Sequence, residues 1–256
     1  MSRIFEALRK ATHLSPATAP AVTPEPPRPA TSAARSAAAP ARSARVIGAL
    51  PRPISVPVRR LDDGLVREVA PLRIHLEAAL TDRSPRVVAF TCSQPGEGTS
   101  SVAADFATLI ATEGRQRVIL VDLHARRPML ETRLFGSDSE SRAPLSSEGS
   151  LALVPMDAEH RAAGYVPSDW AEALIESLAP RADWILLDCP PVLESPEAVD
   201  LAALADGAVL VVQAGSAKRP VIARSQDLLR KTGARLLGTV LNRRRLEIPA
   251  FIYRRI

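Results

Sequence analysis

The sequence predicts a mostly parallel α/β fold in which helices cover both faces of one sheet. Continuous apolar runs alternate with helical patterns, and a Gly-rich turn joins the first run to the first helix of this alternation. Apolar runs of this kind are typical of parallel strands that are buried on both faces. The expected strands are residues 86–90, 117–121, 151–155, 184–187, 207–212 and 236–241, and the expected helices are 102–113, 170–179, 197–204 and 220–232.

The chain begins with a basic arm. Residues 1–60 carry a net charge of +8, whereas the remaining residues carry −3. Residues 1–13 contain a short amphipathic helix with Ile4, Phe5 and Leu8 on one face, suited to docking on a partner or a bilayer surface. A basic arm can bind nucleic acid, an anionic membrane or an acidic partner, and a solvated linker is the plainer interpretation.

The rest of the arm, residues 14–60, is predicted to be a disordered linker. Ten of the 23 prolines fall between Pro16 and Pro57, a stretch without an aromatic residue. Such a segment buries too little apolar surface to offset its ordering entropy.

The folded domain is expected to span residues 61–256 and to open with a helix at 62–80, interrupted by Pro71. With 46% hydrophobic residues the chain can bury a core, and no apolar run approaches the roughly 18 residues of a membrane span. Because Glu6 lies where a signal peptide would be apolar, the expected location is the cytosol. Two cysteines and four scattered histidines support neither a disulfide framework nor a metal cluster.

The turn between Thr91 and Ser101 is a candidate phosphate-binding loop. It follows a strand and opens a helix, where unpaired backbone N–H groups and the helix dipole favour a polyphosphate. The P-loop consensus is G-x-x-x-x-G-K-[ST]. Here Ser93 and Gly98 take the glycine positions and Ser100 the hydroxyl position, but Thr99 stands at the lysine. A simple turn would also explain this string alone. The candidate nucleotide-binding residues are Gly96, Glu97, Gly98, Thr99, Ser100 and Ser101.

Two aspartates end core strands. Asp122 follows the second expected strand of the domain and Asp188 follows the fourth. Each alone is explained by a helix N-cap or a turn. Beside a phosphate loop they form the oxygen-rich setting that Mg²⁺ needs, so Asp122 and Asp188 are the candidate catalytic residues and, with Ser100, the candidate Mg²⁺ ligands.

Five motifs together resemble the bacterial tyrosine kinases (BY-kinases) of capsule and exopolysaccharide biosynthesis. They are Ser-Gln-Pro-Gly-Glu-Gly (93–98), Val-Asp-x-x-x-Arg-Arg-Pro (121–128), Leu-Asp-Cys-Pro-Pro-Val (187–192), Ala-Asp-Gly-Ala-Val-Leu-Val-Val (205–212) and Leu-Gly-Thr-Val-Leu-Asn (237–242). The resemblance implies a P-loop NTPase-like fold that binds ATP or ADP with Mg²⁺. It makes the loop the Walker A motif and places Asp122 in Walker A′ and Asp188 in Walker B, with Asn242 where relatives contact adenine.

The resemblance also implies partners. The expected partner is a membrane-embedded polysaccharide co-polymerase, or chain-length determinant, which would hold the protein at the inner face of the plasma membrane. A homo-oligomer is a second candidate assembly, and nucleic acid is not expected. Tyr253 is the candidate phosphoacceptor, because the tyrosine cluster of the family is reduced to this residue.

The chain departs from the family at functional positions. Thr99 replaces the Walker A lysine, and His124 replaces the second Asp of the D-x-D element. The helix motif E-x-x-R-x-x-R aligns with Arg67-x-x-Ala70-x-x-Arg73, which weakens the expectation of a ring. We therefore favour a regulatory BY-kinase-like protein that binds nucleotide weakly or not at all. The alternatives are an active tyrosine autokinase and a partitioning or septum-site ATPase.

Overall fold

The computed structural model describes residues 50–58, 61–113, 115–135 and 150–243. The expected helix at 1–13, most of the linker and Tyr253 lie outside these residues. None of the described helices is long and apolar enough to cross a membrane.

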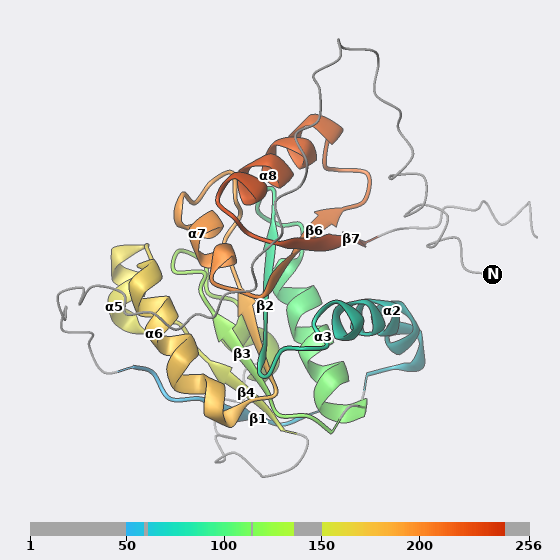
Figure 1. Ribbon diagram of the computed structural model, residues 1–256, viewed down its shortest axis with the longest axis vertical. Coiled ribbons are helices and arrows are strands. Elements are labelled where there is room, and N and C mark those ends of the chain that lie inside the picture. The colour runs from blue at the N-terminus through green and yellow to red at the C-terminus, as the bar shows by residue number, and fades with distance from the viewer. Residues whose placement is uncertain (1–49, 59–60, 114, 136–149, 244–256) are drawn as a thin grey trace, which may run out of the picture. The chain divides into compact units, whose positions relative to one another are not determined.

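One seven-stranded sheet organises the described residues (Figure 1). Its spatial order is β1-β4-β3-β5-β2-β6-β7, and every neighbouring pair is parallel except β1 with β4. The strands are β1 (Ile54–Val56), β2 (Arg86–Cys92), β3 (Val118–Asp122), β4 (Leu151–Val154), β5 (Trp184–Asp188), β6 (Gly207–Gln213) and β7 (Leu236–Asn242). The predicted mostly parallel sheet is confirmed.

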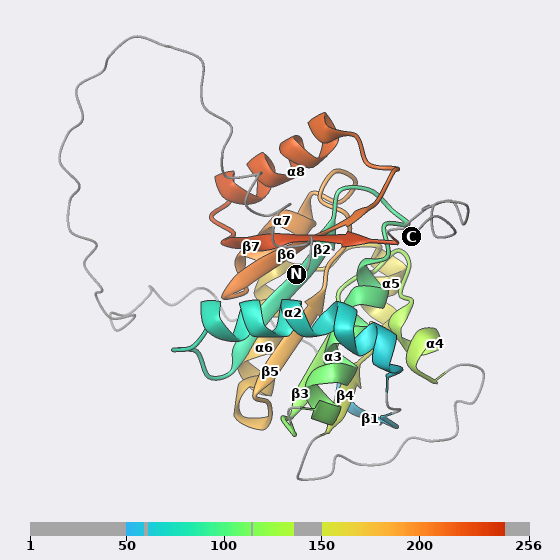
Figure 2. The ribbon, with the colours of Figure 1, turned by 90° about the vertical axis from the view of Figure 1, so that its right-hand side faces the viewer.

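Helices pack on both faces of the sheet (Figure 2). They are α2 (Asp63–Ala79), α3 (Thr99–Glu113), α4 (Leu130–Phe135), α5 (Ala158–Ala163), α6 (Ser168–Leu178), α7 (Glu197–Ala203) and α8 (Arg219–Lys231), with a 3₁₀ turn at Ala179–Arg181. Side chains of α2 and α3 pack with one set of alternating strand residues, and those of α6, α7 and α8 pack with the other set. The strands are therefore buried on both sides, as their continuous apolar runs predicted.

Two sequence predictions need correction. The helix at 62–80 was expected to break at Pro71, but α2 runs through it without interruption. Pro71 is exposed and so is Arg67, whose carbonyl oxygen loses its i+4 donor and is free to bind water.

The second correction concerns the linker. It was expected to end at residue 60, but Ile54–Val56 forms β1, which pairs antiparallel with β4. Pro53 and Pro57 flank this strand, and an edge strand tolerates neighbouring prolines because one side of its ladder needs no donor. Proline content alone therefore placed the start of the folded domain too late.

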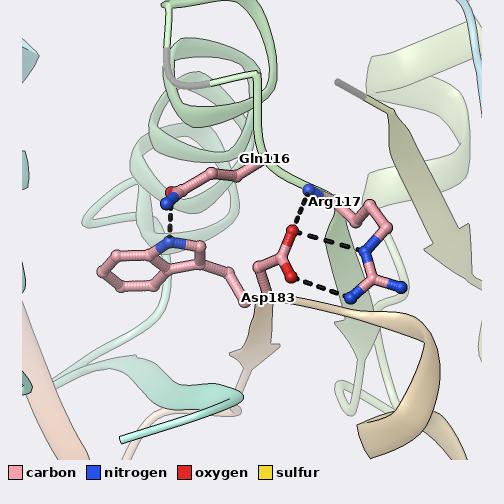
Figure 3. A network of polar contacts seen from close by, with 4 residues as sticks. Gln116, Arg117 and Asp183 are labelled. Atoms are coloured by element: carbon pink, nitrogen blue, oxygen red, sulfur yellow. Dashed lines mark hydrogen bonds and ion pairs between the residues drawn. The ribbon is translucent and has the colours of Figure 1, made fainter. Parts of the chain in front are cut away.

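A polar network fastens the amino ends of β3 and β5 (Figure 3). The Asp183 carboxylate accepts the Arg117 backbone N–H at 2.8 Å and Arg117 Nη2 at 2.8 Å. Beside it, Trp184 Nε1 donates to Gln116 Oε1 at 2.7 Å, and the Trp184 side chain is fully buried. The Arg117 guanidinium and backbone lower the pKa of Asp183 below its usual range.

Replacing Asp183→Ala should lower the free energy of unfolding by about 1 kcal/mol, because the Arg117 backbone and side chain both lose their acceptor. Since the pKa of Asp183 is depressed in the folded state, this contribution is complete above its unfolded pKa of about 4 and is lost as the pH falls below it. Urea unfolding at pH 7 and pH 3 measures both effects.

The matched control is Asp227→Ala. Asp227 pairs with Arg230 at 3.6 Å in the open, with 65% of its side chain exposed, so the change should be within about 0.5 kcal/mol. Equal losses for the two variants would show that the Asp183 network does not stabilise the strand ends.

Candidate functional site

The Gly-rich turn lies between the end of β2 and the start of α3. Thr99 is the first residue of α3, so the turn delivers the helix N-terminus to the carboxyl edge of the sheet. Gly96 and Gly98 have φ angles of +85° and +89°, a region that residues with a Cβ rarely adopt. This confirms the strand, turn and helix order that the sequence predicted.

The Glu97 side chain closes the turn from inside. Its Oε2 accepts the backbone N–H of Ser93 at 2.7 Å and that of Gln94 at 2.9 Å. The first amides of the loop are thus paired within the protein, whereas a wholly unpaired row was expected. The following backbone N–H groups donate to no acceptor among the described residues: those of Gly96, Glu97, Gly98, Thr99 and Ser100.

The end of β7 holds the outer side of the turn. Asn242 Nδ2 donates to the Glu97 carbonyl oxygen at 2.9 Å, and Asn242 Oδ1 accepts the Arg243 N–H at 2.8 Å. Arg243 Nη1 donates to the Gly96 carbonyl oxygen at 3.1 Å. Asn242 therefore contacts the loop itself, and its expected contact with adenine stays a prediction. Arg243 was not singled out from the sequence, although it directly follows Asn242 at a strand end.

Asp122 and Asp188 lie side by side at the carboxyl edge. They are register partners in the parallel pair β3 and β5, and each is at most 2% exposed. The Asp122 carboxylate accepts the N–H groups of His124 at 3.0 Å and Leu130 at 3.3 Å. Among the described residues, no group donates a hydrogen bond of good geometry to either oxygen of Asp188, although the Ser100 hydroxyl lies close enough to act on its pKa. The structure thus places the two aspartates beside each other at neighbouring strand ends, and their shared role as Mg²⁺ ligands stays a prediction.

The pKa values of the pair reflect burial and mutual repulsion. Burial raises the pKa of Asp122 to about 6, against the backbone N–H groups that lower it. The pKa of Asp188 lies well above its usual range, first because of burial and then because of the Asp122 charge, while the Ser100 hydroxyl acts in the opposite direction. Two buried carboxylates beside each other favour a cation between them.

Thr99 places no cation beside these carboxylates. Its hydroxyl is buried and lowers the pKa of the neighbouring Cys92 thiol, but burial first, and then the charges of Glu97 and Asp188, raise that pKa to about 12. Within the part of the chain that the structure describes, every buried side-chain oxygen or nitrogen without a partner belongs to this site. These atoms are Ser93 Oγ, Glu97 Oε1, Thr99 Oγ1 and both Asp188 oxygens.

His124 lies next to the carboxylate pair and contributes no third carboxylate to it. Burial lowers the pKa of His124, and its Nδ1 accepts the Arg127 N–H at 3.2 Å. Among the described residues no group of three or more His, Cys, Asp or Glu side chains is placed to hold a metal ion. The candidate metal ligands at this site are therefore the carboxylates of Asp122 and Asp188 and the hydroxyl of Ser100.

These groups fit a Mg²⁺-nucleotide in their chemistry. Mg²⁺ is commonly bound through one or two carboxylates together with phosphate oxygens of a substrate, and free N–H groups at a helix N-terminus suit those phosphates. The unpartnered oxygens of Asp188 and Thr99 are polar groups that such a ligand would satisfy.

The fold and the loop define the class of protein. No protein-family model matches the chain. The kinase domain of Escherichia coli ETK aligns with a TM-score of 0.57 at 20% identity, covering 79% of this chain and 87% of that one. The Pyrococcus furiosus cell division ATPase MinD aligns with a TM-score of 0.51 at 22% identity over 62% of this chain and 72% of MinD. The chain therefore has a P-loop NTPase-like α/β fold.

Sequence relatives show which proteins with this fold the chain resembles. Tyrosine-protein kinase YwqD of Bacillus subtilis is 29% identical over 190 residues, covering 69% of this chain and 80% of YwqD. The BceF tyrosine kinase domain aligns at 28% identity with a TM-score of 0.52, over 69% of this chain and 76% of that one. The succinoglycan biosynthesis transport protein ExoP of Rhizobium meliloti is 25% identical over 67% of this chain but only 24% of ExoP. The chain is a homologue of the bacterial tyrosine-protein kinases, which confirms the resemblance of its motifs.

Replacing Gly98→Ala should disrupt the loop more than Gly96→Ala. A Cβ at Gly98 would lie 2.1 Å from Asn242 Nδ2, whereas none of the surrounding atoms comes within 4 Å of a Cβ at Gly96. Both variants carry the strain of a positive φ, about 1 kcal/mol each, and only Gly98→Ala adds a clash. Thermal unfolding of the two variants measures the difference.

Adding Asn242→Ala should recover part of the loss in Gly98→Ala and none of the loss in Gly96→Ala. Recovery in neither background would mean that Asn242 does not pack on the loop.

Replacing Asp188→Asn should stabilise the protein without ligand by about 1 to 2 kcal/mol, because it removes a buried carboxylate that lacks a well-placed donor among the described residues. A raised folded-state pKa costs stability once the carboxylate of the unfolded chain is ionised, so the gain should grow as the pH rises above the unfolded pKa of about 4. Unfolding at pH 4.5 and pH 7.5 tests this. A loss of stability at pH 7.5 would contradict the assignment of Asp188 as a buried, unsatisfied carboxylate.

Proposed function

We propose that this chain is a BY-kinase-like regulatory protein of exopolysaccharide or capsule biosynthesis, which binds ATP or ADP with Mg²⁺ weakly. The observation that carries the proposal is the concentration of unpartnered buried polar atoms at the loop and at Asp188. Buried polar groups nearly always have a hydrogen-bond partner. A site in which several buried polar atoms lack a partner is therefore suited to a polar ligand.

Each residue of the site has a role in this proposal. Backbone N–H groups from Gly96 to Ser100 bind the phosphates, and Ser101 continues the helix N-terminus behind them. Ser100, Asp122 and Asp188 bind Mg²⁺, which neutralises phosphate charge when it is bound. Asn242, which already donates to the Glu97 carbonyl oxygen, is the proposed contact for the base.

The absence of the Walker A lysine, where Thr99 stands, argues against efficient phosphoryl transfer. A charge-assisted hydrogen bond contributes about 1.5 to 3 kcal/mol, so its loss weakens nucleotide affinity about ten- to a hundredfold. Phosphoryl transfer depends on cations placed where charge develops in the transition state, so it suffers more than binding does. The proposed role is therefore to sense nucleotide rather than to transfer phosphate quickly.

The proposed partner is a membrane polysaccharide co-polymerase. ExoP, a homologue of this chain, is named as a transport protein of succinoglycan biosynthesis, and this chain matches 24% of its length. We propose that this chain acts with a membrane protein of polysaccharide biosynthesis, which holds it at the inner face of the membrane. Self-association is a second proposed contact.

An active tyrosine autokinase is the second candidate function, supported by the names of YwqD and the BceF domain. In that case Asp122 and Asp188 are catalytic through Mg²⁺, and Tyr253 is the acceptor. The partitioning or septum-site ATPase is less favoured, because the sequence relatives reported above carry kinase or polysaccharide names and the MinD likeness shows the fold alone.

Calorimetric titration with ADP in Mg²⁺ tests the proposal. Wild-type protein should bind weakly, Thr99→Lys should bind about ten- to a hundredfold more tightly, and Asp188→Ala should bind more weakly than wild type. The lysine restores the missing cation, and the alanine removes a Mg²⁺ ligand.

Two outcomes would contradict the proposal. No binding by wild type or by Thr99→Lys would exclude a nucleotide site. Rapid phosphotyrosine formation by wild type, abolished in Tyr253→Phe, would favour the autokinase instead. Lys231→Ala, at the far end of α8, is a matched control that should leave the affinity unchanged.

A further inference from the structure

The site gathers negative charge without a lysine to balance it. Asp122 and Asp188 lie together at the strand ends, and the Glu97 carboxylate is buried in the loop. A nucleotide would bring further negative charge to the same place. Of the three lysines in the sequence, Lys218 and Lys231 belong to the ends of α8, and Lys10 lies outside the described residues. Besides Mg²⁺, a positively charged side chain that contacts the loop among the described residues is that of Arg243.

Arg243 is held against the loop by its own backbone and side chain. Its φ angle of +55° lies in the left-handed region, which a residue without special cause seldom adopts. Its Nη1 donates to the Gly96 carbonyl oxygen at 3.1 Å and to Gln213 Oε1 at 3.4 Å. Its Nε lies 4.0 Å from the point where a Gly98 side chain would begin. The guanidinium thus lies along the glycines of the loop.

Contacts with the described residues leave most of this guanidinium free. An arginine carries five N–H donors, and the hydrogen bonds that hold Arg243 in place by its side chain all use Nη1. Among the described residues no carboxylate forms an ion pair with it. A planar, exposed guanidinium with an unbalanced charge suits the bidentate recognition of phosphate.

We propose that Arg243 binds the polyphosphate of the nucleotide and supplies, from the end of β7, the positive charge that Thr99 does not. The inference rests on the proposed nucleotide site and adds to it the residue that makes binding workable without the consensus lysine. The competing explanation is that Arg243 only fastens the loop through the Gly96 carbonyl oxygen, as Asn242 does through that of Glu97.

Charge and fastening can be separated by substitution. Arg243→Gln keeps an N–H donor for the Gly96 carbonyl oxygen but removes the charge, whereas Arg243→Lys keeps the charge. Lys218→Ala is the control. Lys218 lies at the same edge of the sheet, but its side chain makes no contact with the loop among the described residues. Each variant is compared with wild type by calorimetric titration with Mg²⁺-ADP, after thermal unfolding has shown that it folds.

Arg243→Gln should weaken ADP binding about tenfold in wild type, while Arg243→Lys and Lys218→Ala should change it less than about threefold. In a Thr99→Lys background the loss caused by Arg243→Gln should shrink, because the lysine now supplies the same charge. Such non-additivity is the mark of two groups that serve one function.

The outcomes separate this inference from the proposed function. Wild-type binding that Arg243→Gln leaves unchanged, or an equal loss in both backgrounds, would overturn the role of Arg243 and leave the nucleotide site standing. Binding by Thr99→Lys but not by wild type would also overturn it, since Arg243 would then fail to replace the lysine. The proposed function fails, and this inference with it, if none of the variants binds.

Discussion

The close approach of two buried carboxylates is the constraint on which the site depends. The parallel register of β3 and β5 places Asp122 directly beside Asp188, and apolar side chains on both faces of the sheet keep water from the pair. Asp122 is partly satisfied by backbone N–H groups, but Asp188 has no well-placed donor within the described part of the chain. An arrangement that is costly in the protein alone becomes favourable when a cation binds between the carboxylates. The burial that raises their pKa values therefore also prepares the proposed metal site.

The loop beside this pair is shaped without the help of a ligand. Glu97 pairs the first two amides from inside, and Asn242 and Arg243 hold the carbonyl oxygens from outside. The turn is thereby tied to β7, which is far from it in sequence but adjacent to β6 in the sheet. A loop that is already ordered loses less conformational entropy on binding, which partly offsets the missing lysine.

The sequence predicted the sheet well because its information is local. Continuous apolar runs identified the core strands, and the aspartates that end two of them lie together as expected, because parallel strands share one carboxyl edge. β1 was missed because its three residues lie among prolines, and the helix through Pro71 was missed because exposure of a single proline is not visible in the pattern. The pairing of Glu97 with its own loop depends on the direction of its side chain. The contact of Arg243 with Gly96 depends on the position of the end of β7, which lies more than a hundred residues further along the chain. Neither follows from spacing.

The central claim is that the carboxylate pair and the loop form one site, which needs cation and polyphosphate together. Its most direct test is thermal unfolding with Mg²⁺ alone, with ADP alone and with both. Mg²⁺ offsets the carboxylate charge that repels the phosphates, and the phosphates add oxygen ligands to Mg²⁺, so both together should raise the unfolding temperature by more than the sum of the separate shifts. At a ligand concentration of about 100 times Kd the combined stabilisation should approach roughly 2.7 kcal/mol. An ADP shift that is the same with and without Mg²⁺ would contradict the claim, because it would show that the carboxylates take no part in binding.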